Sequence, residues 1–156
     1  MKARLIYVSD DKTNREVAMK IRDFLAKSNY EVEEFQIKSP FRFGQGSKNH
    51  AQLPQLSGFD LVVVGSPVRN FSPMDCVLDF LREMKNAKNQ KFFLFSTCVA
   101  LPGTTLKRMS NVVTTKSGIV AGAYTVRSLF DISEEKISQM LDYLARSIDN
   151  GTDQAT

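Results

Sequence analysis

The residues that most clearly suggest chemistry follow a short apolar run near the middle of the chain. Residues 61–64 read LVVV, and residues 66–71, SPVRNF, bring hydroxyl, cationic, amide and aromatic side chains directly after them. An unbroken apolar run of this kind is typical of a strand buried on both faces of a parallel sheet. Open α/β sheets bind ligands at the carboxyl ends of their strands. We therefore expect residues 66–71 to form part of a ligand-binding site.

Few other residues suggest catalysis or metal binding. His50 is the only histidine, and it lies in an irregular polar stretch, residues 38–57, without a cysteine or carboxylate cluster beside it. A surface position is therefore expected for it. Cys76 and Cys98 show neither a disulfide framework nor a metal-ligand spacing, which indicates a reduced, cytoplasmic protein without a metal site.

Apolar periodicity predicts strands that alternate with helices on both sides of residues 66–71. The sequence Gly65-Ser66-Pro67 is expected to end the third strand abruptly. Such alternation implies an α/β doubly wound three-layer sandwich, a five-stranded parallel sheet of order 2-1-3-4-5. Strands are expected at residues 4–9, 30–37, 61–64, 91–97 and 119–126, and helices at residues 14–28, from 74 onward, at 104–111 and from 133 onward.

Capping signals predict where the first and last helices begin. Thr13 starts a T-x-x-E capping box, and Ser133 is placed to cap the last helix. Gly151 is expected to end that helix. The chain is then a single domain, residues 1–150, with a disordered tail at residues 151–156.

Charge and hydropathy limit the expected partners. The net charge is +4, so the surface could attract an acidic partner. The basic residues form no run and no nucleic-acid module signature appears, so no nucleic-acid binding is expected. No apolar stretch approaches the roughly 18 residues that a membrane span needs, and the N-terminus shows no signal-peptide pattern.

Three tracts of the chain resemble flavodoxins, especially the short-chain type. FDLVVVGSPV (residues 59–68) resembles their third strand and following loop, and FFLFSTCVALPGTTLKRM (residues 92–109) is similar to their fourth strand, second flavin loop and next helix. GIVAGAYTV (residues 118–126) is similar to their fifth strand, with no insertion splitting it. The resemblance extends over most of residues 3–150.

The resemblance implies non-covalent FMN, with its phosphate in the loop after the first strand and its ring between the two later loops. A helix N-terminus can hold a phosphate, and turn segments can clamp a planar ring. The implied function is electron transfer with a redox partner protein, by a monomer or weak dimer that needs no catalytic residues of its own. The cofactor-binding candidates are Ser9, Asp11, Lys12, Thr13, Asn14, Ser66, Pro67, Val68, Arg69, Asn70, Phe71, Thr97, Cys98, Val99 and Gly103.

The first loop departs from the flavodoxin pattern S-x-T-G-N-T. Lys12 stands where glycine is expected, and Asp10 and Asp11 add two negative charges. Glycine lets a phosphate approach the backbone closely, and carboxylates aimed at the site would repel it. If both carboxylates point outward, Lys12, Thr13, Asn14 and the helix amides could still bind a phosphate. Alternatively, Thr13 only caps the helix and the two aspartates are solvated turn residues.

The later loops leave similar alternatives open. Phe71 could stack on a flavin or pack over the strand ends. Arg69 could raise the potential of a bound flavin or be an exposed cation of little consequence. Cys98 could touch the ring edge or act as a small buried apolar residue. The fourth-strand loop lacks the aromatic residue that flavodoxins stack on the ring, which Phe41 or Phe43 could supply.

Two other functions compete with electron transfer. A flavodoxin-like fold that has lost FMN could serve as a binding or scaffold module, because a fold does not determine a function. The stretch VSDDKTNREVAMKI also resembles the start of response-regulator receiver domains, whose paired acids hold Mg²⁺. However, Gly65 and Ser66 occupy the position where a receiver domain has its phosphorylated aspartate.

Overall fold

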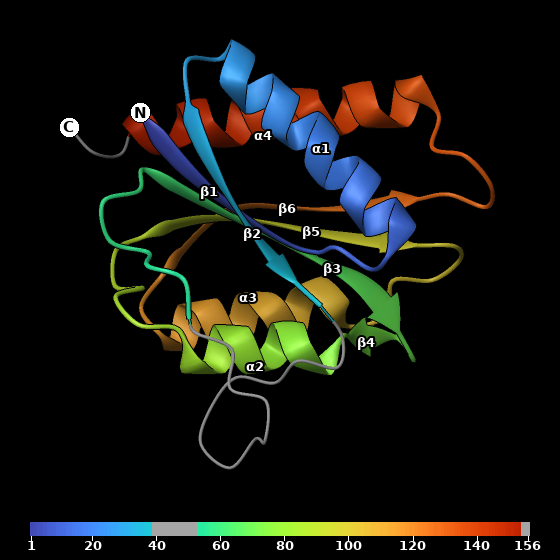
Figure 1. The fold of residues 1–156 in the computed structure, drawn as a ribbon, viewed down its shortest axis with the longest axis horizontal. Helices are drawn as coiled ribbons and strands as arrows, with labels where there is room; N and C mark the ends of the chain where they lie inside the picture. The colour runs from blue at the N-terminus through green and yellow to red at the C-terminus, as the bar shows by residue number, and fades with distance from the viewer. Residues whose placement is uncertain (39–52, 154–156) are drawn as a thin grey trace.

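The computed structural model describes residues 1–38 and 53–153, and within them five parallel strands form the central sheet (Figure 1). Their order is β2-β1-β3-β5-β6. A further short strand, β4, pairs antiparallel with β3. With β4 set aside, this is the predicted 2-1-3-4-5 order of a doubly wound sheet. The bounds are β1 Lys2–Val8, β2 Glu31–Ile37, β3 Leu61–Arg69, β4 Ser72–Pro73, β5 Lys91–Cys98 and β6 Ile119–Arg127.

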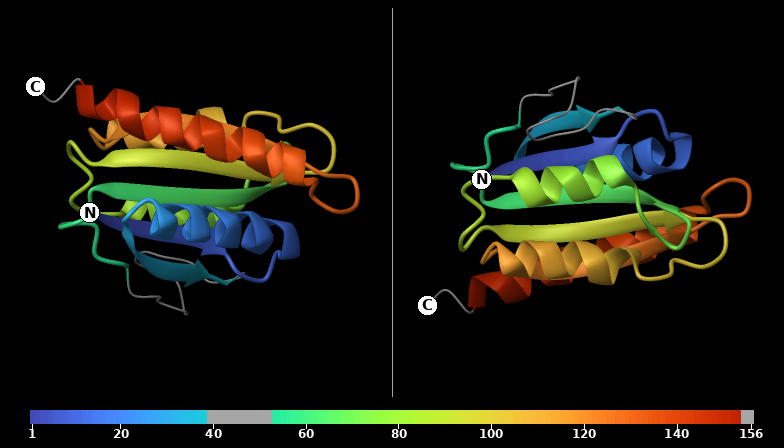
Figure 2. Two further views of the ribbon diagram at one scale, coloured as in Figure 1. Left: turned by 90° about the horizontal axis from the view of Figure 1, so that it is seen from above. Right: turned by 90° about the horizontal axis from the view of Figure 1, so that it is seen from below.

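Four helices of the described chain cover the two faces of the sheet. Helices α1 and α4 lie on one face, and α2 and α3 lie on the other (Figures 1 and 2). The two buried apolar clusters match these layers, since one contains residues of α1 and α4 and the other residues of α2 and α3. The bounds are α1 Lys12–Lys27, α2 Asp75–Glu83, α3 Thr105–Thr115 and α4 Glu134–Asp153.

The unbroken apolar runs are explained by this three-layer arrangement. In β3, Val62 and Val64 pack against the α2 and α3 side, whereas Leu61 and Val63 pack against the α1 and α4 side. Side chains alternate between faces along a strand, so a strand covered on both faces needs apolar residues at every position. Residues 92–95 of β5 are fully buried for the same reason.

The third strand is longer than predicted. The expectation that Gly65-Ser66-Pro67 ends it was wrong, because β3 continues to Arg69. The chain reverses at Asn70 and Phe71, which both have positive φ angles of 51° and 60°. Arg69 then pairs with Ser72 in a two-residue hairpin, a geometry that requires positive φ at both turn residues. The hairpin carries Phe71 outward at the carboxyl edge of the sheet.

The first helix begins earlier than the capping box predicted. Asp11 is the N-cap, and its Oδ1 accepts a hydrogen bond of 2.9 Å from the backbone N–H of Asn14. Thr13 therefore lies within the first turn, and its predicted role as the cap was wrong. Aspartate is an equally good cap, so the local sequence allowed either start.

The last helix begins as predicted and ends later. Ser133 Oγ accepts from the backbone N–H of Lys136 at 3.2 Å, which confirms the cap. The helix runs through Gly151 to Asp153, so the prediction that Gly151 ends it was wrong. Residues 154–156 of the expected tail lie outside the described residues, as do Phe41, Phe43 and His50. Within the described part, no helix is long and apolar enough to cross a membrane.

Candidate functional site

The loops that follow β1, β3 and β5 meet around one cavity at the carboxyl edge of the sheet. Its volume is about 360 Å³, which falls in the range of small-molecule sites. Ten predicted residues line it: Asp11, Thr13, Pro67, Val68, Arg69, Asn70, Phe71, Thr97, Cys98 and Val99. Ala100, Leu101 and Ser128 complete the lining. Five predicted residues do not line it: Ser9, Lys12, Asn14, Ser66 and Gly103.

Asn14 turns inward and holds the first loop in place. Its side chain is fully buried, and its Oδ1 accepts from the backbone N–H of Val8 at 2.9 Å. Its Nδ2 donates to Thr97 Oγ1 at 3.4 Å, which joins α1 to β5. Since both ends of the amide have protein partners, Asn14 shapes the site without facing it.

Ser66 and Gly103 also position the loops. Ser66 is fully buried, and its Oγ accepts from the backbone N–H of Met74 at 3.0 Å, where α2 begins. Gly103 has a φ angle of +58°, and a Cβ there would lie 2.3 Å from the carbonyl oxygen of Phe71. Thr104 donates its backbone N–H to the same oxygen at 2.9 Å. Close contact between the β5 loop and the hairpin therefore requires glycine at position 103.

An ion pair joins the first and third loops across the cavity. Arg69 Nη2 lies 3.0 Å from Asp11 Oδ2. The pair offsets the negative charge of Asp11, which would otherwise repel a phosphate. Arg69 is therefore not an unpaired surface cation. The sequence offered no signal for it, because the two residues are 58 positions apart and no motif relates one to the other.

Lys12 and Arg15 lie at the outer side of the first loop. The side chain of Lys12 is 75% exposed, and its Nζ lies 3.8 Å from Glu16. Arg15 Nη1 donates to the carbonyl oxygen of Ser9 at 2.9 Å, a role that sequence reasoning missed. Both cations contribute positive charge near the N-terminus of α1.

Phe71 is held in a strained conformation at the mouth of the cavity. A φ angle of 60° is unusual for an aromatic residue and costs about 1–3 kcal/mol. Its side chain is 62% exposed, so apolar packing does not compensate the strain. Arg108 Nη1 donates to Ser72 Oγ at 2.9 Å, and Thr104 bonds to Phe71 itself, so the hairpin is fixed from the α3 side.

Two buried serine hydroxyls at the edge of the site have no hydrogen-bond partner among the described residues. Ser9 follows β1 and is 8% exposed, and Ser128 follows β6 and is 7% exposed. Buried hydroxyls almost always have a partner, so each exception needs an explanation. Sequence reasoning missed Ser128, although its position directly after a parallel strand could have indicated it by the same rule that selected the other loops.

The environment of both cysteines disfavours their thiolate forms. Burial raises the pKa of the Cys76 thiol to about 11. Burial also raises the pKa of the Cys98 thiol, while the charge of Arg127 acts in the opposite direction. Only thiolates are strong nucleophiles, so burial disfavours the reactive form of Cys98 at the cavity wall.

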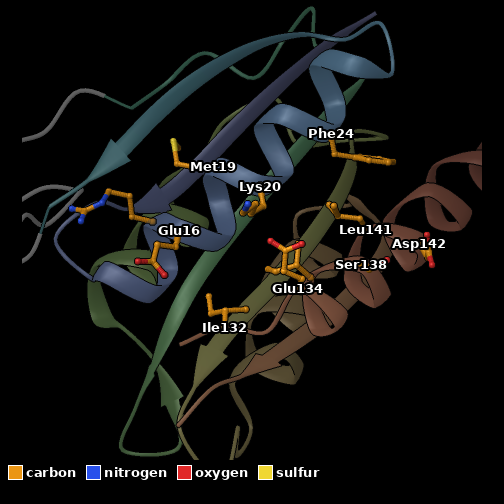
Figure 3. A pocket seen from close by; sticks show the side chains of 11 residues that line it. Glu16, Met19, Lys20, Phe24, Ile132, Glu134, Ser138, Leu141 and Asp142 are labelled. Carbon is orange, nitrogen blue, oxygen red and sulfur yellow. The ribbon is translucent and has the colours of Figure 1, made fainter. Parts of the chain in front are cut away.

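A larger cavity, of about 650 Å³, lies between α1 and α4 on one face of the sheet (Figure 3). Met19 and Phe24 of α1 and Leu141 of α4 contribute apolar surface to it. Its charged and hydroxyl side chains are all exposed: Arg15, Glu16, Lys20, Glu134, Ser138 and Asp142. Its described lining residues include no buried polar group to orient a ligand, unlike those of the smaller cavity, so we take the smaller cavity as the candidate site.

Comparisons with known proteins agree with the topology. No family model and no curated protein matches the sequence. Among solved structures, a short-chain flavodoxin associated with a bacterial microcompartment is 17% identical with a TM-score of 0.69, over 97% of this chain and 98% of that one. A flavodoxin from Streptococcus pneumonia is 14% identical with a TM-score of 0.68, over 94% of this chain and 99% of that one.

The fold is flavodoxin-like. A WrbA-like flavodoxin from Agrobacterium tumefaciens gives a similar match, at 13% identity and a TM-score of 0.69 over 97% of this chain and 98% of that one. The resemblance to flavodoxins that the three tracts suggested is thus confirmed at the level of the fold. At such identities the likeness does not extend to ligand or activity, which depend on the site itself.

Proposed function

We propose that the chain binds FMN in the cavity at the carboxyl edge and carries one or two electrons between redox partners. The observation that supports this most is the convergence of the three predicted loops on one cavity of a flavodoxin-like fold. When bound, FMN supplies the electron-transfer chemistry. The residues of the chain then have to hold a phosphate at one end and a planar ring at the other.

The N-terminus of α1 supplies the groups for the phosphate. The first N–H groups of a helix have no partner within it, and Asp11 accepts only that of Asn14. The backbone N–H groups of Lys12 and Thr13 are therefore suited to an anion at this end of the cavity, which Thr13 lines. Arg69 offsets the negative charge of Asp11. These groups fit a phosphate despite the missing glycine.

The ring would lie between the hairpin and the β5 loop. Phe71 presents an exposed aromatic face there, and Val99 and Leu101 add apolar surface. Thr97 and Ser128 provide buried hydroxyls among the residues that line the cavity. Apolar walls with a few buried polar groups are the usual composition of a cofactor site.

The substitution Asp11→Asn is expected to strengthen FMN binding. Asparagine keeps the helix cap, removes the carboxylate and releases Arg69 from its ion pair. The expected gain is roughly fivefold to thirtyfold, which corresponds to about 1–2 kcal/mol. Arg69→Gln should weaken binding, because the charge of Asp11 is then uncompensated. Fluorescence titrations of both variants with FMN measure these opposite changes, and a shift in the same direction for both would contradict the assignment.

The substitution Ser128→Ala is expected to weaken FMN binding by roughly threefold to tenfold, the effect of one lost hydrogen bond. The stability of the ligand-free protein should stay the same or rise, because the hydroxyl has no partner to lose within residues 1–38 and 53–153. Ser147→Ala is the matched control: Ser147 is also 7% exposed, but its hydroxyl donates to the carbonyl oxygen of Tyr143 at 2.8 Å. That variant should lose stability and keep its FMN affinity. Unchanged FMN affinity in Ser128→Ala would remove Ser128 from the site.

The proposed function is tested by incubating the purified protein with FMN and separating it by gel filtration. Flavin absorbance bands that elute with the protein, and that bleach and return through reduction and reoxidation, are the expected result. A protein peak without flavin bands, at micromolar concentrations of both components, would contradict the proposal.

A binding or scaffold module without FMN is the second candidate. The observation that favours it is the occupation of first-loop groups by protein partners: Asp11 and Arg69 pair with each other, and both ends of the Asn14 amide are bonded. The gel-filtration experiment separates the two candidates. A receiver-like phosphorylation switch gains no such support, because Asp11 serves as a helix cap and ion-pair partner.

A further inference from the structure

Exposed apolar side chains gather at the carboxyl edge of the sheet. Seven large apolar side chains are strongly exposed in residues 1–38 and 53–150, and five of them lie in the loops after β3, β5 and β6. These five are Phe71, Val99, Leu101, Leu129 and Phe130. Single exposed apolar residues are ordinary, but clusters of them mark interaction sites.

Leu129 and Phe130 differ from the other three because they do not line the cavity. Their side chains are 73% and 93% exposed. The loop that carries them is anchored at its start, since Ser128 donates its backbone N–H to the carbonyl oxygen of Cys98 at 2.9 Å. Lys136 Nζ also donates to the carbonyl oxygen of Arg127 at 2.6 Å. A ligand in the cavity could cover Phe71, Val99 and Leu101, and these contacts hold Leu129 and Phe130 beside it.

We infer that Leu129 and Phe130 form a docking surface for a redox protein that presents an apolar patch beside its own cofactor. The inference rests on the proposed function, because it takes a flavin bound in the cavity as the source of the electrons. Electron transfer requires the partner to approach that cavity. Leu129 and Phe130 directly follow Ser128, which lines the cavity, so they lie next to it.

The charges around this surface indicate that apolar contact dominates the docking. Arg69 and Asp11 offset each other in an ion pair. Within residues 127–136, exposed Arg127 and Lys136 stand against exposed Asp131, Glu134 and Glu135, so the two signs nearly balance. A surface with little net local charge steers partners weakly. The acidic partner that the overall charge of +4 suggested is therefore not required at this surface.

Two haem proteins of opposite charge are suitable probes: a basic c-type cytochrome and an acidic, soluble b-type cytochrome. FMN-loaded protein is reduced photochemically and mixed with each ferric cytochrome in a stopped-flow instrument. Each ferric haem takes one electron and becomes ferrous. Two haems oxidise one two-electron-reduced flavin, whose protons pass to the buffer. The second-order rate constant is measured at low and at high ionic strength.

The double substitution Leu129→Ser with Phe130→Ser is expected to lower both rate constants about tenfold, because buried apolar area drives the encounter complex. The same reduction should appear at low and high ionic strength. Ile119→Ser is the matched control, an exposed apolar residue at the opposite end of β6. It should leave both rates unchanged. Reduction of a small neutral quinone should be equal in all three proteins, which shows that the flavin itself is unaltered.

Equal cytochrome rates in the double variant and the unsubstituted protein would overturn the inference while leaving FMN binding intact. The inference would also be overturned if the double substitution left the rates unchanged while salt changed them in opposite directions for the two cytochromes. That result would assign docking to charge. Co-sedimentation with phosphatidylcholine vesicles that the double substitution abolishes would reassign the surface to a membrane. If the protein retained no FMN, the proposed function would be contradicted, and the inference that rests on it would be overturned as well.

Discussion

Replacing Gly65 by alanine is expected to lower the free energy of unfolding by about 2–3 kcal/mol, the upper part of the range for overpacking a core. A Cβ at this position would lie 2.0 Å from Cζ of Phe95, on the neighbouring strand β5. Phe95 is fully buried against the α1 and α4 layer, so its ring cannot move aside freely. Urea denaturation followed by circular dichroism measures the change.

A double-mutant cycle shows whether the Phe95 ring is the cause. Phe95→Leu alone should destabilise the protein, because it leaves unfilled space in the core. In the Phe95→Leu background, Gly65→Ala should cost clearly less than it does alone, since the shorter side chain gives room for the methyl group. Strictly additive effects would contradict the proposed steric conflict.

The second large effect is expected for Asn14→Ala, which should lower the free energy of unfolding by about 2–4 kcal/mol. The substitution leaves the buried N–H of Val8 without its acceptor and removes the link to Thr97. An unsatisfied buried group costs about 1–3 kcal/mol, and the lost packing adds to it. Because Asn14 holds the first loop against β5, FMN affinity should fall as well. Urea denaturation and FMN titration of the same variant measure both changes.

Thr97→Val provides the matched comparison for Asn14. It removes only the acceptor of the Asn14 Nδ2 group, whereas the bond from Val8 remains. A cost of about 1 kcal/mol is expected, the usual contribution of one hydrogen bond. If the two variants were equally destabilised, the bond to Val8 would not be the important one.

Most of the fold could be predicted from the sequence because the signal is repeated in every element. Strands β3 and β5 are apolar at consecutive positions, which only burial on both faces explains, and the helices between strands have one apolar side. Errors appeared where a single residue decides between two local solutions. Asp11 and Thr13 can both cap a helix, and Pro67 does not prevent β3 from continuing to Arg69.

The position of the site was also predictable, since the carboxyl ends of parallel strands meet at one edge. The roles of individual side chains were not. Asn14 was expected to face a phosphate and instead bonds to Val8 and Thr97, which depends on the orientation of its side chain. The pairing of Asp11 with Arg69 depends on the approach of two loops that are distant in sequence. Such contacts arise from tertiary structure, and no local pattern encodes them.

The central claim is that the first loop holds the phosphate of FMN. Calorimetric titration with FMN and with riboflavin tests this claim most directly. The two ligands share the ring and differ in the phosphate. We expect FMN to bind at micromolar concentrations or tighter, and riboflavin to bind at least about tenfold more weakly, a difference of about 1.4 kcal/mol. Equal affinities would show that the first loop does not hold a phosphate. No heat of binding with either ligand would contradict the assignment of the cavity to a flavin.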